Sequence, residues 1–405
     1  CGTAPDHIRA LSKALSGLAP VSRTPEKRSI LCSATTVVDA ADAVVVGERI
    51  NPTGKKRFQQ ALREGDMDYI LTQAVSQADA GAQMLDVNVG LPGTDEPAMM
   101  QRTVEALQGV VDLPLQLDST SPEALARGLR RYCGKALVNS VNGKQEVLDS
   151  ILPLCRKYGA AVIGLTLDEN GIPSTAEGRV AIARRIVQAA AGYGIPARDV
   201  YIDCLTLTVS AQQDEAMETL RALSTCKREL GVRTVLGVSN ISFGLPCRGH
   251  LNAAFYTMAL AAGLDLAIIN PNAEGMMAAV SAFRVLTGRD AQAAAYIARY
   301  ADAAPAQASS APGAVGLAEA VEKGLKAEAA QAAKALLAAT EPLEVVNGTL
   351  IPALDRVGQR FEQGTLYLPQ LLQAATADRA AFELVKQAIA AAGAEQVSRG
   401  RIVLA

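Results

Sequence analysis

Short apolar runs rich in Val, Ile and Leu alternate with longer segments of helical period from about residue 43 onward. This alternation is typical of βα units around a parallel sheet. Eight runs recur at a spacing of roughly 30 residues, and a helix-length stretch follows each. The runs are residues 44–51, 84–90, 113–120, 136–143, 161–171, 200–208, 234–244 and 266–272. They predict a (β/α)8 barrel rather than an open doubly wound sheet, and none carries a GxGxxG loop.

The C-terminal ends of these runs share a polar character, because each run begins apolar and closes with carboxylates or amides. The residues are Glu48, Asn51, Asp86, Asn88, Asp118, Asn139, Asn142, Asp168, Asp203, Asn240 and Asn270. In a (β/α)8 barrel such positions share the C-terminal rim, where active sites form. Some of them could simply cap helices or satisfy loops, as Asp and Asn often do. Because they recur in phase, we expect a ligand at this rim.

The segments on either side of the barrel follow other patterns. Residues 1–18 indicate a loop and a helix capped by Thr3 or Asp6, and a connector follows to residue 40. Residues 302–316 have the small side chains of a flexible linker. We therefore expect five parts along the chain. They are an N-terminal tail with connector at 1–40, a barrel at 41–301, a linker at 302–316, a helical bundle at 317–395, and the first strand of a further domain at 396–405.

Helical period runs almost unbroken through residues 317–392, with breaks at Gly324, Pro342 and Gly364 that predict about four helices. Apolar residues recur every three or four positions along one face, as a packed bundle requires. They are Val346, Leu350, Leu354, Val357 and Phe361.

Composition narrows the classes of partner. Hydrophobic residues make up 49% of the 405, and 39 basic side chains nearly balance 41 acidic ones. This balance gives no electrostatic support for binding nucleic acid or an anionic membrane, and we predict neither partner. The chain shows no signal peptide and no long uncharged apolar stretch. Its seven cysteines form no CxxC pair, which favours reduced thiols and a cytoplasmic location.

The rim chemistry indicates a hydrogen-bonding heterocycle. A carboxylate accepts two neighbouring N–H donors, and an Asn amide matches a mixed donor and acceptor edge. A phosphorylated sugar would instead favour a glycine-rich phosphate loop after the last strands, and the sequence has none there.

Five motifs carry a specific resemblance. They are "VVVGERINPTG", "LDVNVG", "LQLDST", "NSVNG" and "VSNISFGLPCRGHLN". They closely resemble the pterin-binding barrel of the cobalamin-dependent methionine synthases, which are relatives of dihydropteroate synthase and of the corrinoid methyltransferases. The match covers residues 40–300. The segment "LIPALDRVGQRFEQGTLYLPQLLQAA" resembles the cobalamin cap helices of that family, and "CGTAPDHIRAL" resembles the end of its homocysteine-binding domain.

The resemblance implies a pterin-binding TIM barrel like that of dihydropteroate synthase, followed by an all-α four-helix cap. It implies methyl transfer from N5 of 5-methyltetrahydrofolate to cob(I)alamin within methionine synthesis. We therefore expect the chain to correspond to a segment of such an enzyme. Its partners would be the folate substrate and the cobalamin-binding, homocysteine-binding and reactivation domains of a longer chain.

The resemblance also assigns roles to rim residues. Asp118, Asn139 and Asp203 would contact the pterin edge, and Glu48 and Asn51 would stand at the rim near the ring. Arg248 would lie at the outer end of the folate or orient its own loop.

Asn240 would sit against N5, the atom that bears the methyl group. The physical case for an amide there is independent of the family, because N5 is a poor leaving group unless it is protonated. An amide that donates or accepts after a small rotation can hold both protonation states, whereas a carboxylate would trap the proton.

In the cap, the resemblance implies that Phe361, Tyr367 and Leu368 cover the methyl face of cobalamin. Phe and Leu at helical spacing are more often ordinary bundle core. Cys1 resembles a zinc ligand of the homocysteine-binding domain, and its companions lie outside this sequence. We therefore expect no metal in this chain, because tetrahedral zinc needs about four ligands.

Two alternative functions remain open. One is a dihydropteroate synthase, disfavoured by the lack of Arg- and Lys-bearing pyrophosphate loops and by the extra helical domain. The other is a non-catalytic folate-binding module, because further domains are absent from the chain. A corrinoid iron–sulfur protein methyltransferase shares the barrel, but residues 315–392 count against it.

Overall fold

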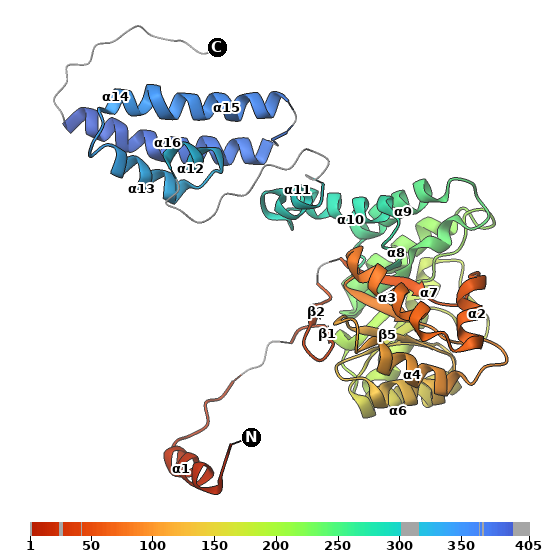
Figure 1. The fold of residues 1–405 in the computed structure, drawn as a ribbon. Coiled ribbons are helices and arrows are strands. Elements are labelled where there is room, and N and C mark those ends of the chain that lie inside the picture. The colour runs from red at the N-terminus through yellow and green to blue at the C-terminus, as the bar shows by residue number, and fades with distance from the viewer. Residues whose placement is uncertain are drawn as a thin grey trace. The chain divides into compact units, whose positions relative to one another are not determined.

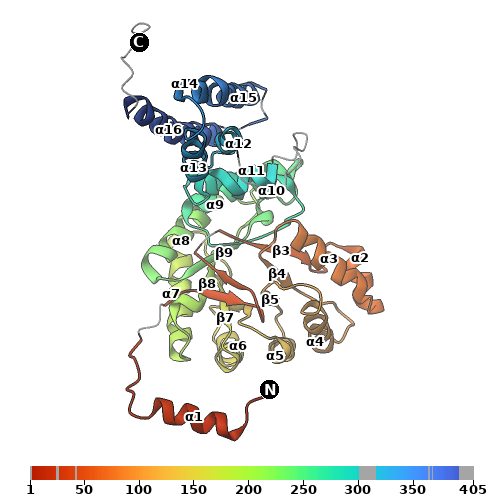
Figure 2. The same ribbon diagram turned by 60° about the vertical axis from the view of Figure 1, so that its left-hand side comes forward.

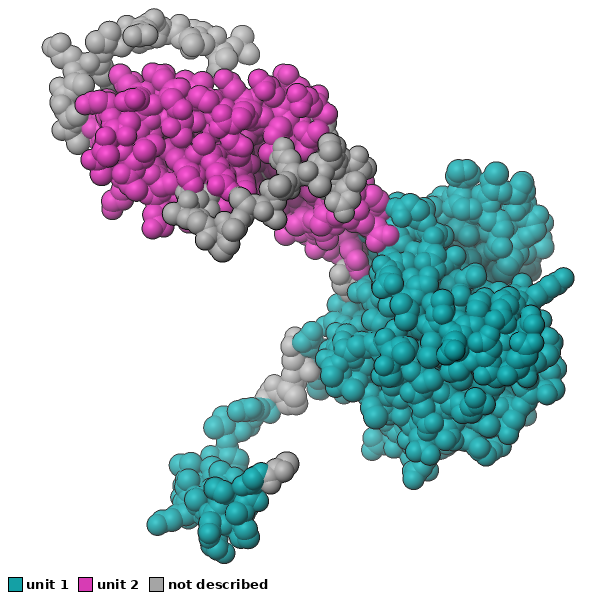
Figure 3. Space-filling view, in the orientation of Figure 1, with its two compact units in different colours: residues 1–280 teal, residues 281–405 magenta. Residues whose placement is uncertain are grey.

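A computed structural model describes residues 2–23, 27–41, 43–300, 316–363, 365–366 and 368–391. The chain divides into two compact units, residues 1–280 and 281–405 (Figure 3). Among the described residues, no helix is both long enough and apolar enough to cross a membrane.

The first unit contains a closed barrel of eight parallel strands in the order β10-β3-β4-β5-β6-β7-β8-β9 (Figures 1 and 2). The strands are β3 (Val44–Ile50), β4 (Met84–Val87), β5 (Leu115–Asp118), β6 (Leu137–Asn142), β7 (Ala161–Leu165), β8 (Val200–Asp203), β9 (Arg233–Gly237) and β10 (Leu266–Ile269). Each predicted apolar run contains one of these strands, so the predicted fold class is confirmed. The first and last strands close the barrel through the pairing of Leu266 with Val44.

Helices surround the barrel, and several begin at the cap that their sequence provides. The Asp95 side chain accepts from the backbone N–H of Ala98 at 3.0 Å, and Thr175 caps α7 in the same way. The helices of this unit are α2 (Lys56–Glu64), α3 (Met67–Asp79), α4 (Glu96–Leu107), α5 (Pro122–Arg131), α6 (Gln145–Tyr158), α7 (Ala176–Gly192), α8 (Glu215–Leu230) and α9 (Arg248–Ala262). The residues of α10 (Glu274–Leu286) are divided between the two units, and α11 (Ala294–Tyr300) belongs to the second. Short 3-10 turns lie at Ala197–Asp199, Val238–Ser242 and Ala291–Ala293.

An antiparallel hairpin precedes the barrel, where the sequence predicted only a connector. Its strands are β1 (Ile30–Cys32) and β2 (Val37–Asp39). Leu31 is fully buried in the same apolar cluster as Val44 and Val46 of β3. The hairpin was missed because each strand has only three residues, too few to show an alternating pattern.

The N-terminal helix α1 (Pro5–Leu15) forms as predicted, but its predicted cap is wrong. Ala4 is the N-cap residue and has no side-chain cap, so neither Thr3 nor Asp6 fills that role. Instead, the backbone N–H of Ala4 donates to Nδ1 of His7 at 2.9 Å. No residue of α1 is buried.

The helices of the second unit after residue 316 are α12 (Leu317–Glu322), α13 (Lys326–Leu336), α14 (Pro342–Val345), a π turn (Val346–Leu350), α15 (Ile351–Glu362) and α16 (Leu368–Ala391). They pack around an alanine-rich core. On the predicted apolar face, Leu350 and Val357 are buried and Val346 and Leu354 are partly buried, but Phe361 is exposed, so the prediction is wrong for Phe361. Gly324 separates α12 from α13 and has the left-handed backbone value φ +69°. A Cβ at this position would lie 2.6 Å from Cβ of Gln373. The predicted linker, except Gly316, and the predicted final strand lie outside the described residues, so these boundaries stay predictions.

Candidate functional site

Buried acidic side chains lie near the carboxyl ends of the neighbouring strands β4 and β5, and β6 adds an amide beside them. Asp86 pairs in register with Gln116, and Asp118 pairs with Asn139. Nε2 of Gln116 donates to Oδ1 of Asp86 at 2.6 Å, and Nδ2 of Asn88 donates to Oδ2 of Asp118 at 2.9 Å. The strand register therefore gathers two carboxyls and three amides on one side of the barrel rim.

Burial disfavours the ionised form of both carboxyls. It raises the pKa of Asp86 well above its ordinary value, with further contributions from the negative charges of Asp118 and Glu48, while the hydrogen bond from Gln116 acts against the rise. Burial likewise raises the pKa of Asp118 to about 6, against the hydrogen bond from Asn88 and with a smaller push from Glu96. Groups of this kind are unusually common at binding and catalytic sites.

Asp203 ends β8 and lies at the same rim of the barrel. Its Oδ1 accepts from the backbone N–H of Leu205 at 2.7 Å, and its side chain is only 9% exposed. Burial raises its pKa to about 7, even though backbone hydrogen bonds from Leu205 and Gly237 and the positive charge of Arg179 oppose the rise. Near neutral pH this carboxyl is therefore poised between its two protonation states.

Glu48 and Asn51 lie at the end of β3 and just beyond it. Burial raises the pKa of Glu48, and Lys55, Arg49 and a hydrogen bond from Ser239 oppose the rise. Lys55 reaches back to the backbone carbonyl of Glu48 at 2.9 Å, and burial lowers the pKa of its ammonium group. Asn51 accepts the backbone N–H of Thr53 at 2.9 Å, which leaves its amide nitrogen available.

Asn240 lies in the 3-10 turn after β9, and its side chain is exposed. The turn is held from two directions. Oγ of Ser239 donates to Oε2 of Glu48 at 3.4 Å, and Nη2 of Arg248 donates to the Ser239 carbonyl at 2.8 Å. The Arg248 guanidinium also donates to Oγ of Ser242 and lies over the Phe243 ring, 4.4 Å from its centroid. Arg248 thus contacts its own loop.

Two buried acceptors near the rim have no hydrogen-bond partner among the described residues, Oε1 of Gln116 and Oγ1 of Thr206. An unpaired buried acceptor costs free energy, on the order of 1–3 kcal/mol. A ligand rich in N–H donors would satisfy such atoms together with the three carboxyls. Within the part of the chain that the structure describes, no group of three His, Cys, Asp or Glu residues could hold a metal ion.

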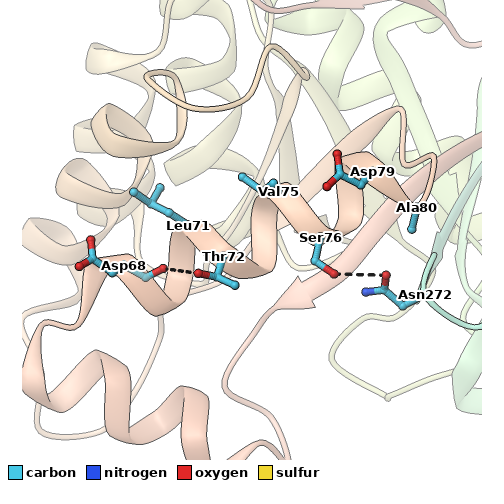
Figure 4. Close-up of a pocket in the computed structure, with 8 residues that line it drawn as sticks. All are labelled: Asp68, Leu71, Thr72, Val75, Ser76, Asp79, Ala80 and Asn272. Carbon is cyan, nitrogen blue, oxygen red and sulfur yellow. Dashed lines mark hydrogen bonds between the residues drawn. The ribbon is translucent and has the colours of Figure 1, made fainter.

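A hollow of about 430 Å³ opens beside Asp118 and has lining residues from the loops after β3, β4 and β5. Asn88, Glu96 and Ser119 are among them, and Oγ of Ser119 donates to Oε1 of Glu96 at 2.5 Å. A roomier hollow of about 830 Å³ lies along one face of α3 beside Asn272 (Figure 4). Of the three buried carboxyls, Asp118 lines the first hollow and none lines the second, so we place the candidate site at the first.

The predicted cap residues are only partly described. Phe361, near the end of α15, is 40% exposed. Leu368 begins α16, but its side chain, Tyr367 and Cys1 lie outside the described residues. An exposed aromatic ring fits a flat apolar ligand face, which agrees with the predicted cobalamin contact.

Several residues at the site were not predicted. Gln116 lies in β5 between two leucines, and a polar residue inside an apolar strand is the one feature of the sequence that could have indicated it. Lys55, Glu96, Ser119 and Ser239 come from loops and helix starts, and sequence patterns do not reveal which loops meet in space. Arg179 lies within a helix and gives no signal at all.

Comparisons with known proteins agree with this geometry. Residues 47–270 match the pterin binding enzyme family, and residues 315–386 match the B12 binding domain. Methionine synthase of Mycobacterium tuberculosis is 31% identical over all of this chain, which spans 37% of that protein. Methylcorrinoid:tetrahydrofolate methyltransferase of Eubacterium limosum is 32% identical over 61% of this chain and 92% of its own length.

Solved structures give the same fold. Dihydropteroate synthase of Xanthomonas albilineans, solved with 4-aminobenzoic acid, has a TM-score of 0.51 and covers 64% of this chain with 99% of its own. At 17% identity this likeness concerns the barrel fold alone.

Proposed function

Because the chain belongs to the pterin-binding enzyme family, we propose that its barrel binds 5-methyltetrahydrofolate and passes the N5 methyl group to cob(I)alamin. The observation that carries this proposal is the set of buried carboxyls at one rim, Asp86, Asp118 and Asp203, each with a raised pKa. A pterin ring offers several N–H donors along its edges. Its binding would compensate the cost of ionising these groups in a buried place.

Asp118, Asn139 and Asp203 hold the pterin edge in this proposal. A carboxylate at Asp203 accepts two adjacent N–H groups, and the amide of Asn139 can donate and accept on the neighbouring edge. Asp118 and Asn139 are paired in register, so they present their side chains side by side on adjacent strands. The ring would be oriented by groups fixed on strands, which positions N5 for transfer.

Asn240 acts at N5. Its exposed side chain can rotate to donate to an unprotonated nitrogen or to accept from a protonated one, so it serves both states along the reaction. Glu48, Ser239 and Arg248 hold the turn that carries it. Arg248 thereby serves to orient this loop, and Glu48 and Asn51 border the ring.

The corrinoid is the methyl acceptor, and when bound it supplies a strongly nucleophilic cobalt centre. Residues 315–386 match a B12 binding domain, and Phe361 with Tyr367 and Leu368 would cover its reactive face. An apolar cover would exclude water from the transfer.

The match of this chain to methionine synthase along its whole length favours a role in methionine synthesis. The chain spans 37% of the Mycobacterium tuberculosis methionine synthase and 24% of that of Mycobacterium leprae, so homocysteine-binding, cobalamin-binding and reactivation domains would be partners in a longer protein. The zinc that the resemblance implies belongs to that homocysteine-binding domain.

Methyl transfer from a corrinoid to tetrahydrofolate is a second candidate, because the Eubacterium limosum relative bears that name and matches the barrel. The helical unit at residues 315–386, matched by the methionine synthase as well, favours the first candidate.

Calorimetric titration of the chain with 5-methyltetrahydrofolate tests the folate site. We expect saturable binding with one ligand per chain, and the affinity should weaken as pH falls through 7 and 6, where Asp203 and Asp118 take up protons. Dihydropteroate synthase substrates provide the contrast. Tighter binding of a pterin pyrophosphate than of the methylated folate would favour that alternative and contradict the proposal.

A further inference from the structure

Arg179 is a fully buried arginine on α7, one of the largest side chains wholly removed from solvent in the described residues. Its guanidinium donates to the backbone carbonyls of Pro173 at 2.8 Å, Cys204 at 3.0 Å and Leu205 at 3.2 Å. It also donates to Oγ1 of Thr219 at 2.6 Å and pairs with the carboxylate of Glu215.

These contacts converge on the segment that follows β8. Leu205 has the left-handed backbone value φ +63°, which a leucine adopts only where its surroundings hold it. Arg179 and Thr219 both donate to the Leu205 carbonyl, and the N–H of Leu205 donates to Asp203. A chain of hydrogen bonds therefore runs from α7 and α8 through one strained residue to the Asp203 carboxyl.

A guanidinium in this place is costly to bury. Taking a charge out of water is unfavourable, and well-packed apolar residues often stabilise such a place as well or better. A planar fork of donors, however, can bind several carbonyls at fixed angles, which an apolar side chain cannot. The unfavourable burial of the Arg179 guanidinium is explained if the site requires one fixed conformation of the loop after β8.

We infer that Arg179 is a positioning residue, which fixes the segment from Asp203 to Leu205 so that the Asp203 carboxyl points to the ring edge of a bound folate. The consequence for folate rests on the proposed function, whereas the hold on the loop does not. Asp203 is influenced by the Arg179 guanidinium from α7 and by the backbone amides of Leu205 and Gly237. The Cys204 thiol, which faces Cys226 of α8, lies next to it in the chain.

Three variants of the full chain separate shape from charge. Arg179→Met removes the donors and the charge, and Arg179→Lys keeps the charge but loses the fork. Arg184→Met is the matched control, because Arg184 also lies on α7 and pairs with Glu229 of α8, at 3.5 Å on the surface. The first readout uses no ligand. It consists of the pH titration of the Asp203 carboxyl by carbon NMR, assigned with Asp203→Asn, and hydrogen exchange of the Leu205 amide.

We expect Arg179→Met to move the Asp203 titration to higher pH and to speed Leu205 exchange at least tenfold. Arg179→Lys should speed the exchange but leave the titration near its wild-type position, and the control should change neither. At pH 7 the affinity for 5-methyltetrahydrofolate should fall about tenfold or more in both Arg179 variants, the loss expected when a charge-assisted contact is misplaced. Equal losses in Arg184→Met would contradict the inference.

The failure modes are distinct. Wild-type protein that binds no folate would overturn the proposed function, and the titration and exchange data would still decide on Arg179. A folded Arg179→Met with unchanged titration and unchanged exchange would overturn the inference. Should that variant not fold, Thr219→Val removes the second donor to Leu205 at constant shape. It must then speed Leu205 exchange, and unchanged exchange would count against the inference in the same way.

Discussion

At the residue scale, the buried carboxyl of Asp203 opposes the stability of the fold at neutral pH. Its carboxyl titrates near 7 in the folded chain and near 3.8 in the unfolded chain, because burial penalises its charge. The folded state therefore holds this proton more tightly. The residue's contribution to stability is lost as pH rises from about 4 to 7, and the penalty is complete above that range.

Asp203→Asn should therefore stabilise the protein while it disables the site. At pH 8 we expect the free energy of unfolding to rise by on the order of a few kcal/mol, and the gain should shrink as pH falls towards 4. The amide oxygen can still accept the Leu205 N–H, so the loop is kept. Denaturant unfolding at several pH values measures this. A destabilised Asn variant at pH 8 would refute the reading of Asp203 as a costly buried acid.

Asn240→Ala should act on the reaction more than on binding. Because the amide faces N5 in our proposal, its loss should slow methyl transfer at least a hundredfold. The affinity for tetrahydrofolate, which lacks the methyl group, should fall only a few-fold. Stopped-flow spectroscopy with reduced cobalamin gives the first quantity and calorimetry the second. Equal losses in both would show that Asn240 only binds.

The sequence placed the polar residues at strand ends correctly, because side chains at the carboxyl ends of parallel strands must share a rim. It could not reveal the contacts that set their charge. The pairing of Asp86 with Gln116 depends on strand register, and the hold of Arg179 on Leu205 depends on a helix packing across a loop. Roles such as that of Asn240 came from family resemblance and remain predictions.

At the scale of elements, the strands were predictable because each is a short buried apolar run, and a segment of helical period follows each run. The hairpin of β1 and β2 and the start of α1 were not. A three-residue strand has too little pattern to recognise, and the backbone of Ala4 is satisfied by His7 rather than by a typical capping residue.

Gly164 marks a close approach between a strand and a helix. A Cβ on Gly164 of β7 would lie 2.8 Å from Cγ2 of Ile186, a fully buried residue of α7. Gly164→Ala should therefore cost about 1–3 kcal/mol of stability through overpacking. Gly192→Ala at the end of α7 meets nothing within 4 Å and should cost nothing or stabilise slightly. Thermal unfolding gives the melting temperatures of both variants. Equal melting temperatures would show that β7 and α7 can accommodate a methyl group at Gly164.

At the scale of the whole molecule, the two units carry separate parts of the proposed function. Each rim residue that we discuss lies between positions 44 and 270, inside the first unit. A chain that ends at residue 300 should therefore melt cooperatively and bind 5-methyltetrahydrofolate with the affinity of the full chain. Calorimetry tests this, and a loss of more than tenfold would show that the helical unit takes part in folate binding.

A methyl-transfer assay tests the proposed reaction directly. The full chain is mixed with 5-methyltetrahydrofolate and chemically reduced cob(I)alamin, and the visible spectrum is followed with time. We predict that cob(I)alamin is converted to methylcobalamin at a rate proportional to the concentration of the chain. One tetrahydrofolate should appear for each methyl group transferred. Saturable folate binding without any enzyme-dependent methylcobalamin would contradict this prediction.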